Sequence, residues 1–254
     1  MLKFHWVNSI FILLVILLFI FKVPVYIFIL LIFGWLILTI IGSFHMRWNY
    51  HVNALNFNAQ VKQNAIAITF DDGPHPEYTP QILAILQQYN AKATFFCIGK
   101  EIEKHPELFK KMVEDGHVVG NHSFSHSNHF GFFTSSKVID ELNQTKKLIN
   151  KIIRKNCTLF RPPFGVTNPA IKKAIRQTNS HVIGWNKRSL DTKIKDPEKI
   201  YHRITKGLKA GDVILLHDTN ERAVSVLEQL LLFLQKNQLE TITIDKLFEI
   251  EAYD

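Results

Sequence analysis

The stretch Ala65-Ile66-Ala67-Ile68-Thr69-Phe70-Asp71-Asp72-Gly73-Pro74 joins a short apolar run to two carboxylates and a turn. An apolar run of this length is typical of a strand that is buried on both faces. Neighbouring strand residues point to opposite faces, so Asp71 and Asp72 can serve one site only if the chain leaves strand geometry there. Gly73-Pro74 makes such a departure possible, although Asp-Asp-Gly-Pro also suits a solvated turn.

Further apolar runs alternate with helical segments along the chain. We predict strands at 65–70, 93–98, 118–119, 159–160, 181–185, 213–216 and 240–244, and helices at 79–89, 106–114, 136–155, 169–177, 197–208 and 223–236. Strands separated by helices predict a parallel sheet, because parallel neighbours need a crossover connection. The predicted fold class is α/β, a distorted (β/α) barrel of about seven strands, with a doubly wound sheet as the alternative.

The first 50 residues differ from the rest of the chain. Between Lys3 and Arg47 the only charged residue of the Lys, Arg, Asp and Glu types is Lys22, which separates the apolar stretches 4–21 and 23–44. A bilayer-spanning helix needs roughly 20 mostly apolar residues, which the second stretch meets and the first approaches. We therefore predict an N-terminal membrane anchor at 1–50, with one or two transmembrane helices, and a globular domain at 60–254. A cleaved signal peptide is the alternative, but no run of small residues follows either stretch.

Composition and charge place few limits on the partner. Three of the 30 Lys and Arg residues but none of the 22 Asp and Glu residues precede Tyr50, which leaves a net charge of +5 on the rest of the chain. That charge is spread without a basic block, so we predict no nucleic-acid partner. This mild excess of positive charge suits either binding to a polyanionic surface or simple solubility. Cys97 and Cys157 could form one disulfide, but Cys97 lies in an apolar run, which favours buried free thiols.

In parallel α/β folds the chemistry gathers at the carboxyl ends of the strands. The third predicted strand runs into Gly120-Asn121-His122-Ser123-Phe124-Ser125-His126. If this segment is helical, His122 and His126 lie on one face of it, a spacing that suits two imidazoles on one metal ion. Together with a carboxylate from another strand end they would form a common set for Zn²⁺ or a similar divalent ion. Without such a carboxylate, a pair of histidines at this spacing is more often exposed on the surface than part of a site.

Three later strand ends are also polar: Arg161-Pro162-Pro163-Phe164-Gly165, Ser189-Leu190-Asp191 and Leu215-Leu216-His217-Asp218. Arg161 could hold a carboxylate through two parallel hydrogen bonds. His217 would face the mouth of the barrel, where an imidazole can act as a general acid or can be a structural residue. Five such features in one linear order are much less easily explained by coincidence than any one alone.

These five motifs, in this order, resemble those of the NodB-like polysaccharide deacetylases (family-four carbohydrate esterases) over roughly residues 65–244. The resemblance implies a metal-dependent hydrolase that removes N-acetyl groups from amino sugars. It implies Asp71 as the catalytic base and His217 as the general acid. Asp72, His122 and His126 would hold a divalent metal, Zn²⁺ first, with Co²⁺ or another divalent ion as alternatives. The substrate-binding or orienting residues that it implies are Arg161, Pro163, Phe164, Gly165, Asp191 and Leu215.

The chain departs from the family around the fourth motif. The family often has an acidic residue three positions before its aspartate and a Trp just after it, where this chain has Arg188 and Thr192. These differences concern the shape and charge of the substrate groove rather than the reaction. The loop 127–135 carries Phe130, Phe132 and Phe133, which either form a substrate wall or pack against the following helix.

The anchor and the resemblance together predict a cell-membrane protein whose catalytic domain, at 60–254, is extracytoplasmic. The expected partners are the membrane and an N-acetylated glycan, with peptidoglycan first because the anchor would hold the enzyme against the wall. A lipid-linked or surface amino sugar is an alternative substrate, and a non-catalytic glycan-binding protein is an alternative function. The oligomeric state is not predicted.

Overall fold

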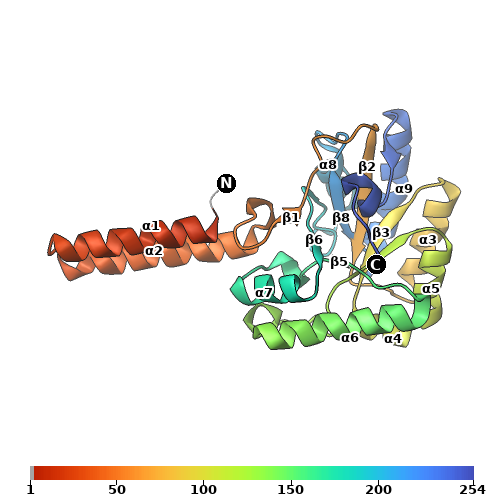
Figure 1. Ribbon diagram of the computed structural model, residues 1–254. Coiled ribbons are helices and arrows are strands. Elements are labelled where there is room, and N and C mark those ends of the chain that lie inside the picture. Colours follow the sequence, from red (N-terminus) through yellow and green to blue (C-terminus); the bar gives the residue numbers. More distant parts are fainter. Residues whose placement is uncertain (1–2) are drawn as a thin grey trace.

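Nine parallel strands form one curled sheet in the computed structural model, which describes residues 3–254 (Figure 1). The hydrogen-bonded order is β1-β6-β5-β4-β3-β2-β8-β7, and β9 pairs with the start of β2. Strands that follow one another in the chain are mostly neighbours in the sheet, as in a barrel. No pairing between β1 and β7 is found in residues 3–254, so the barrel stays open between these two edges.

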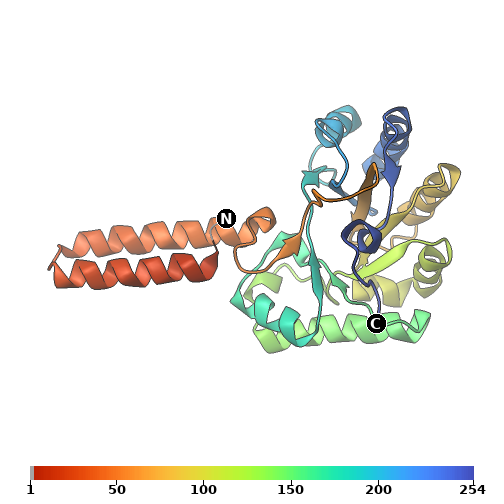
Figure 2. The same ribbon diagram turned by 45° about the horizontal axis from the view of Figure 1, so that its top comes forward.

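The strands are β1 (Ala54–Leu55), β2 (Ala65–Asp71), β3 (Ala93–Cys97), β4 (Val118–Asn121), β5 (Leu159–Phe160), β6 (His181–Ile183), β7 (Lys187–Arg188), β8 (Val213–His217) and β9 (Glu240–Thr241). The helices are α1 (Phe4–Ile20), α2 (Val25–Phe44), α3 (Tyr78–Gln88), α4 (Gly99–Lys104), α5 (Pro106–Glu114), α6 (Ser135–Ile153), α7 (Pro169–Gln177), α8 (Pro197–Thr205), α9 (Glu221–Lys236) and α10 (Ile244–Phe248). Short 3₁₀ turns are η1 (Met46–Trp48), η2 (Phe130–Phe132) and η3 (Pro163–Gly165). Figure 2 shows the helices fanning around the outside of the sheet.

The predicted parallel α/β barrel is confirmed, and all seven predicted strands are present. The structure adds β1 and β7, which do not stand out as apolar runs: β1 is Ala54-Leu55 between two asparagines, and β7 is Lys187-Arg188. The strand predicted at 240–244 ends at Thr241, and α10 begins at Ile244.

The core lies between the sheet and its helices. Every residue of β2, β3 and β4 is buried, because helices or loops cover both faces of these strands. Phe70 and Phe95 stack with their ring centroids 5.0 Å apart in this core. Cys97 is buried and free, as its apolar run favoured, and Cys157 is buried and free as well, so the possible disulfide is not formed.

The helices α1 and α2 pack against each other as an antiparallel hairpin that projects from the domain (Figures 1 and 2). Trp35 Nε1 donates a 2.8 Å hydrogen bond to Asn8 Oδ1, and its ring stacks on Phe11, so Trp35 joins the two helices. By length and composition α2 could cross a membrane, whereas α1 is apolar but shorter. Lys22 lies at the tip of the hairpin, in the turn between the two helices.

The open end of the hairpin is attached to the domain by specific contacts. The Phe4 amide donates to the carbonyl of Tyr50, and the Thr167 amide donates to the carbonyl of Ser43, both at 2.9 Å. A Cβ on Gly42 would lie 2.5 Å from the ring of Tyr50, so glycine is required at this close approach. The end of α2 is therefore joined directly to the loop that follows β5.

Candidate active site

The carboxyl end of β2 brings Asp71 and Asp72 to one side of the sheet. Asp71 is the last strand residue, and Asp72 has a φ of 79°, in the left-handed region. This conformation turns the chain out of strand geometry directly after Asp71. Both carboxylates can therefore face the same site, as one shared site required.

Asp72, His122 and His126 form a compact group of three possible metal ligands. Asp72 Oδ1 lies 3.4 Å from His122 Nε2 and 3.3 Å from His126 Nε2, and the possible ligand atoms all lie within 4.8 Å of one another. The segment 122–126 is a loop, with positive φ at Ser123 and His126, so the two histidines do not share a helix face. The two imidazoles nevertheless meet, because β4 delivers His122 and the loop returns His126 beside it.

The orientation of this group suits a cation. Burial lowers the pKa of His122, but the carboxylates of Asp71 and Asp72 outweigh it and raise that pKa, so a bound cation would replace a proton there. His122 Nδ1 lies 2.7 Å from the carbonyl oxygen of Arg161, which can only accept, so Nδ1 carries the hydrogen and the Nε2 lone pair of a neutral His122 faces Asp72. Burial raises the pKa of Asp72, but the histidines around it outweigh burial and hold that pKa below its usual range. Burial lowers the pKa of His126 to about 4. Asp72 Oδ1 is buried and has no hydrogen-bond partner within residues 3–254. This donor set fits a divalent ion.

A buried carboxylate on α6 holds the loop that carries these histidines. Glu141 is 2% exposed and accepts hydrogen bonds from the amides of Phe124 (3.1 Å) and Ser125 (2.7 Å) and from the Ser125 hydroxyl (2.9 Å). Sequence reasoning missed Glu141. Its signal is its place on the same helix face as the buried Val138 and Thr145, where a charged residue needs a partner.

Arg161 is fully buried and ties the end of β2 to β5 and β6. Its Nη1 donates to Asp71 Oδ1 at 2.6 Å and to the Thr69 hydroxyl at 2.9 Å. Its Nε and Nη2 donate to the carbonyls of Ile183 and Gly184, at 3.2 and 2.9 Å. Arg161 therefore does contact Asp71, but through one nitrogen and not through the expected pair of parallel bonds. The other oxygen, Asp71 Oδ2, lies 3.9 Å from His122 Nε2.

His217 ends β8 directly opposite Asp71 in the parallel ladder. Its Nδ1 donates to Asp191 Oδ1 at 2.8 Å, and Asp191 Oδ2 accepts from the His217 amide at 2.8 Å. The hydroxyl of Ser189 and the side-chain amide of Asn220 complete the partners of the fully buried Asp191. Burial lowers the pKa of His217, but the hydrogen bond and charge of Asp191 outweigh it and raise that pKa to about 9. His217 is thus a cation whose Nε2–H is left for the site.

Phe164 forms one wall of the site. Its φ is 59°, it is 46% exposed, and its ring centroid lies 4.7 Å from that of His126. Its backbone N–H has no acceptor within the part of the chain that the structure describes. Pro163 and Gly165 are buried on either side, and a Cβ on Gly165 would lie 2.6 Å from the ring of Trp185.

The remaining predicted residues lie around this centre. Leu215 is 2% exposed and lies two residues before His217 on the same face of β8, so it lies beneath the site. Arg188 is exposed on β7, with its guanidinium 5.8 Å from the centre of the Trp185 ring. In the loop 127–135, Phe130 is fully buried, whereas Phe132 is 89% exposed.

Asp218, which follows His217, is a second buried carboxylate that sequence reasoning left without a role. Its Oδ2 accepts a 2.6 Å hydrogen bond from the Thr79 hydroxyl, and burial raises its pKa to about 7. A Cβ on Gly73 would lie 2.0 Å from Asp218 Oδ2, so only glycine fits in the turn after Asp72. Thr79 directly precedes Pro80, a position that favours a helix N-cap, but it lies inside α3 and its hydroxyl donates to Asp218 instead.

Residues 58–183 match the sequence model of a family described as polysaccharide deacetylase. A peptidoglycan-N-acetylglucosamine deacetylase from Bacillus cereus is 36% identical over 190 residues, which are 73% of this chain and 88% of that protein. The structure of the peptidoglycan deacetylase PdaC from Bacillus subtilis matches with a TM-score of 0.70 and 32% identity, over 74% of this chain and 91% of that one. A Bacillus anthracis structure described as a CE4 family pseudoenzyme matches with a TM-score of 0.68 and 25% identity, over 73% of this chain and 66% of that one.

Proposed function

The chain belongs to the polysaccharide deacetylase family, and on that premise we propose that it is a membrane-anchored, metal-dependent enzyme that removes N-acetyl groups from peptidoglycan outside the cell. The observation that carries the proposal is the meeting of five side chains at the carboxyl ends of β2, β4 and β8. The possible ligand atoms of Asp72, His122 and His126 lie within 4.8 Å of one another. Asp71 and His217 flank them and are paired with each other in the ladder between β2 and β8. Relatives named as peptidoglycan deacetylases support the choice of polymer.

Asp72, His122 and His126 would hold a divalent ion, Zn²⁺ first. When bound, such an ion supplies Lewis acidity, which polarises an amide carbonyl and lowers the pKa of water. The Nδ1–H of His122 is held by the Arg161 carbonyl, so this histidine is oriented before any ion arrives.

The flanking residues would move the protons. Asp71, held by Arg161, would accept a proton from the attacking water, and the Phe164 N–H would donate a hydrogen bond to the oxyanion that forms. His217 would then donate its Nε2 proton to the leaving nitrogen as the C–N bond breaks. The products are acetate and a free amino sugar, and the cycle closes when Asp71 releases its proton to solvent and His217 takes one up.

The first experiment measures acetate release by the purified full chain from peptidoglycan and from N-acetylglucosamine oligomers, with Zn²⁺ or Co²⁺ added. We expect turnover that Asp71→Asn and His217→Ala abolish. The matched control Asp196→Asn removes the same charge at an exposed helix cap and should leave the rate unchanged. Folded protein that releases no acetate with any metal would contradict the proposed chemistry, and an active Asp71→Asn variant would contradict the choice of base.

The metal assignment has a readout of its own. Elemental analysis of the purified chain should find close to one divalent ion per molecule, and Asp72→Asn should lose most of it. The control is Asp71→Asn, because Asp71 is paired with Arg161 and is not among the three ligands. Equal metal content in wild type and Asp72→Asn would show that the ion is held elsewhere.

A second candidate substrate is a lipid-linked amino sugar, and one observation favours it. An apolar cavity of about 550 Å³ lies between the end of α2 and the site, with Ile40 and Phe44 on one side and Phe132 and Phe164 on the other. An acyl or prenyl chain that leaves the bilayer beside α2 would meet this cavity. We expect Phe132→Ala to slow the deacetylation of a lipid-linked amino sugar and to leave that of purified wall unchanged; the opposite pattern would exclude this candidate.

A non-catalytic glycan-binding role is a further alternative, because a relative on this fold is described as a pseudoenzyme. The intact metal set and the flanking Asp71 and His217 count against it, and the acetate assay decides it.

The orientation of the anchor is also part of the proposal. The hairpin places the start of α1 and the end of α2 at the same end, so we expect an N-terminal tag to be cleaved by protease on intact cells. Cleavage only after permeabilisation would instead indicate a single span.

A further inference from the structure

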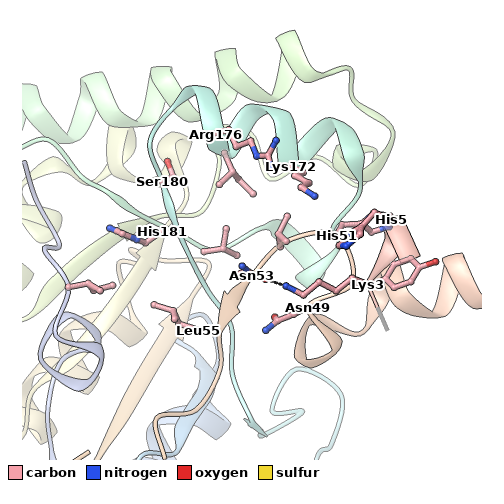
Figure 3. Close-up of a pocket in the computed structure, with 15 residues that line it drawn as sticks. Lys3, His5, Asn49, His51, Asn53, Leu55, Lys172, Arg176, Ser180 and His181 are labelled. Atoms are coloured by element: carbon pink, nitrogen blue, oxygen red, sulfur yellow. Dashed lines mark hydrogen bonds between the residues drawn. The ribbon is translucent and has the colours of Figure 1, made fainter. Parts of the chain in front are cut away.

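A cavity of about 590 Å³ lies at the junction between the hairpin and the domain (Figure 3). Its basic and imidazole side chains come from three segments: Lys3 and His5 at the start of α1, His51 after η1, and Lys172, Arg176 and His181 around α7. Figure 3 shows Lys172 and Arg176 on α7 along one side of the cavity, with Lys3 and Asn53 across from them. The cavity is separate from the candidate active site and shares no lining residue with it.

All the charged residues of the lining are basic. It contains no Asp or Glu, and the segments that supply most of it contain none either, because residues 1–70 and 142–190 lack both residue types. Within residues 3–254, Lys3, Lys172 and Arg176 form no salt bridge. Lys172 and Arg176 are four residues apart, so α7 presents them on one face. Several cations without a counter-charge attract an anion strongly.

His51 adds a buried polar atom to this cavity. Its side chain is almost fully buried, and its Nε2 lies 3.0 Å from the Ser43 hydroxyl, which itself donates to the carbonyl of Thr39. His51 Nε2 therefore donates to Ser43, which leaves Nδ1 as the acceptor of a neutral ring, with no partner in the described part of the chain. Burial and the charge of Lys172 lower the pKa of His51 to about 4. An anion beside Lys172 would offset that charge and favour a protonated ring whose Nδ1–H donates to the anion.

The position of the cavity indicates which anion is available. The cavity lies where α1 begins and α2 ends, at the domain end of the proposed anchor. The 20 residues of α2 make a helix about 30 Å long, which matches the hydrocarbon thickness of a bilayer. Groups just beyond Phe44 would therefore lie at the depth of the lipid headgroups, where phosphates are abundant and where Lys and Arg clusters bind them.

We infer that this cavity binds the phosphate of an anionic lipid headgroup and so holds the catalytic domain in one orientation on the membrane. The inference rests on the proposed anchoring of α1 and α2 but not on the proposed chemistry. The site is also connected to the catalytic loop. His51 contacts Ser43, and the Ser43 carbonyl accepts from Thr167, three residues after Phe164. A bound headgroup would thus brace the end of α2 against the loop that forms the wall of the active site.

The test uses the purified full chain in mixed micelles and counts the lipids that stay bound by native mass spectrometry. With phosphatidylglycerol and phosphatidylcholine offered in equal amounts, we expect one phosphatidylglycerol per chain. The double variant Lys172→Gln/Arg176→Gln should bind it roughly thirtyfold more weakly, since each cation near a lipid surface contributes about a factor of five. The matched control Lys199→Gln/Lys236→Gln removes the same charge from α8 and α9, away from the hairpin, and should bind within about twofold of wild type.

Three further measurements keep the outcome clear. Imidazole NMR of the wild-type chain needs no variant: short-chain phosphatidylglycerol should raise the pKa of His51 from about 4, and short-chain phosphatidylcholine should not. Equal retention of the two lipids, an unchanged double variant or an unchanged His51 would each overturn the inference. Displacement of the lipid by millimolar inorganic phosphate would show a site for free phosphate instead. Release of the chain by alkaline extraction of membranes would refute the anchor itself, whereas an anchored chain without lipid preference would refute only this inference.

Discussion

Replacing Asp191 by Asn should move the alkaline limit of activity to lower pH. The proposed general acid, His217, must be protonated to donate its proton, so kcat/KM should fall as the pH rises through the pKa of His217. That pKa is raised from 6.5 to about 9, against the effect of burial, chiefly by the hydrogen bond and charge of Asp191. Asn occupies the same space and can still accept from Nδ1, but it removes the negative charge.

The size of the effect follows from the pKa difference. The rise from 6.5 to about 9 corresponds to about 3 kcal/mol of preference for the protonated ring. If the charge of Asp191 supplies half of this preference, the pKa of His217 falls by about one unit in the variant. At pH 9 the protonated fraction would then be about one half in wild type and about one tenth in the variant, so the variant should lose about fivefold more of its plateau activity than wild type. An ion bound at Asp72 acts on both proteins alike, so the difference between them remains.

The assay is acetate release at substrate concentrations below KM, from pH 6 to pH 10.5, for wild type, Asp191→Asn and the charge-matched control Asp196→Asn. The position of the alkaline limb is compared, and not its height, because a change of imidazole tautomer would lower the whole profile without moving it. We expect the limb to move only in Asp191→Asn. Coinciding limbs for Asp191→Asn and wild type, in folded protein, would refute the reasoning about His217.

Glu141→Leu leaves the half-buried amides of Phe124 and Ser125 without their acceptor and frees the loop of the two histidines, so Co²⁺ titration against a chelator should show about tenfold to hundredfold weaker metal binding. Phe130→Ala should cost about 3–5 kcal/mol and lower the thermal midpoint of the chain in detergent by about 10 °C, whereas Phe132→Ala should change stability by less than about 0.5 kcal/mol. Asp71→Ala strands the buried guanidinium of Arg161 and should cost a similar 3–5 kcal/mol, much of which Arg161→Met in the same chain should restore. Equal midpoints for Phe130→Ala and Phe132→Ala, or no rescue by Arg161→Met, would contradict these assignments.

The sequence predicted the sheet and the strand-end residues because both follow from local patterns. A buried parallel strand is an unbroken apolar run, and the first one or two polar residues after it mark the edge where sites form. This rule identifies Asp71, His122, Arg161 and His217 from the sequence alone, and the structure places all four at one edge of the sheet. The resemblance then supplied roles that patterns alone do not, such as an orienting role for Asp191, which in the structure accepts a hydrogen bond from His217.

The supporting residues could not be found in this way, because their partners are distant in the sequence. Glu141 binds amides 16 and 17 residues earlier, and Asp218 binds a hydroxyl 139 residues away. Both residues are buried carboxylates that need partners, and their burial follows from the packing of α6 and α3 against the sheet. Thr79 shows the same limit: its sequence favours a helix cap, but tertiary contact with Asp218 prevails over that local preference.

The placement of the proposed base and acid is a consequence of where two apolar runs end. In the ladder between β2 and β8, Thr69 pairs with Leu215 and Asp71 with His217. A slip of one residue would turn Thr69 and Asp71 away from Arg161 and carry Phe70 into their place, which would bury a carboxylate in the apolar layer and leave a buried guanidinium unpaired. All residues of β2 are buried, so a slip would exchange one apolar side chain for another at most positions and would cost free energy chiefly at Thr69 and Asp71. The contacts of these two residues with Arg161 therefore also help to hold Asp71 opposite His217, and the acid and base require no separate device to bring them together.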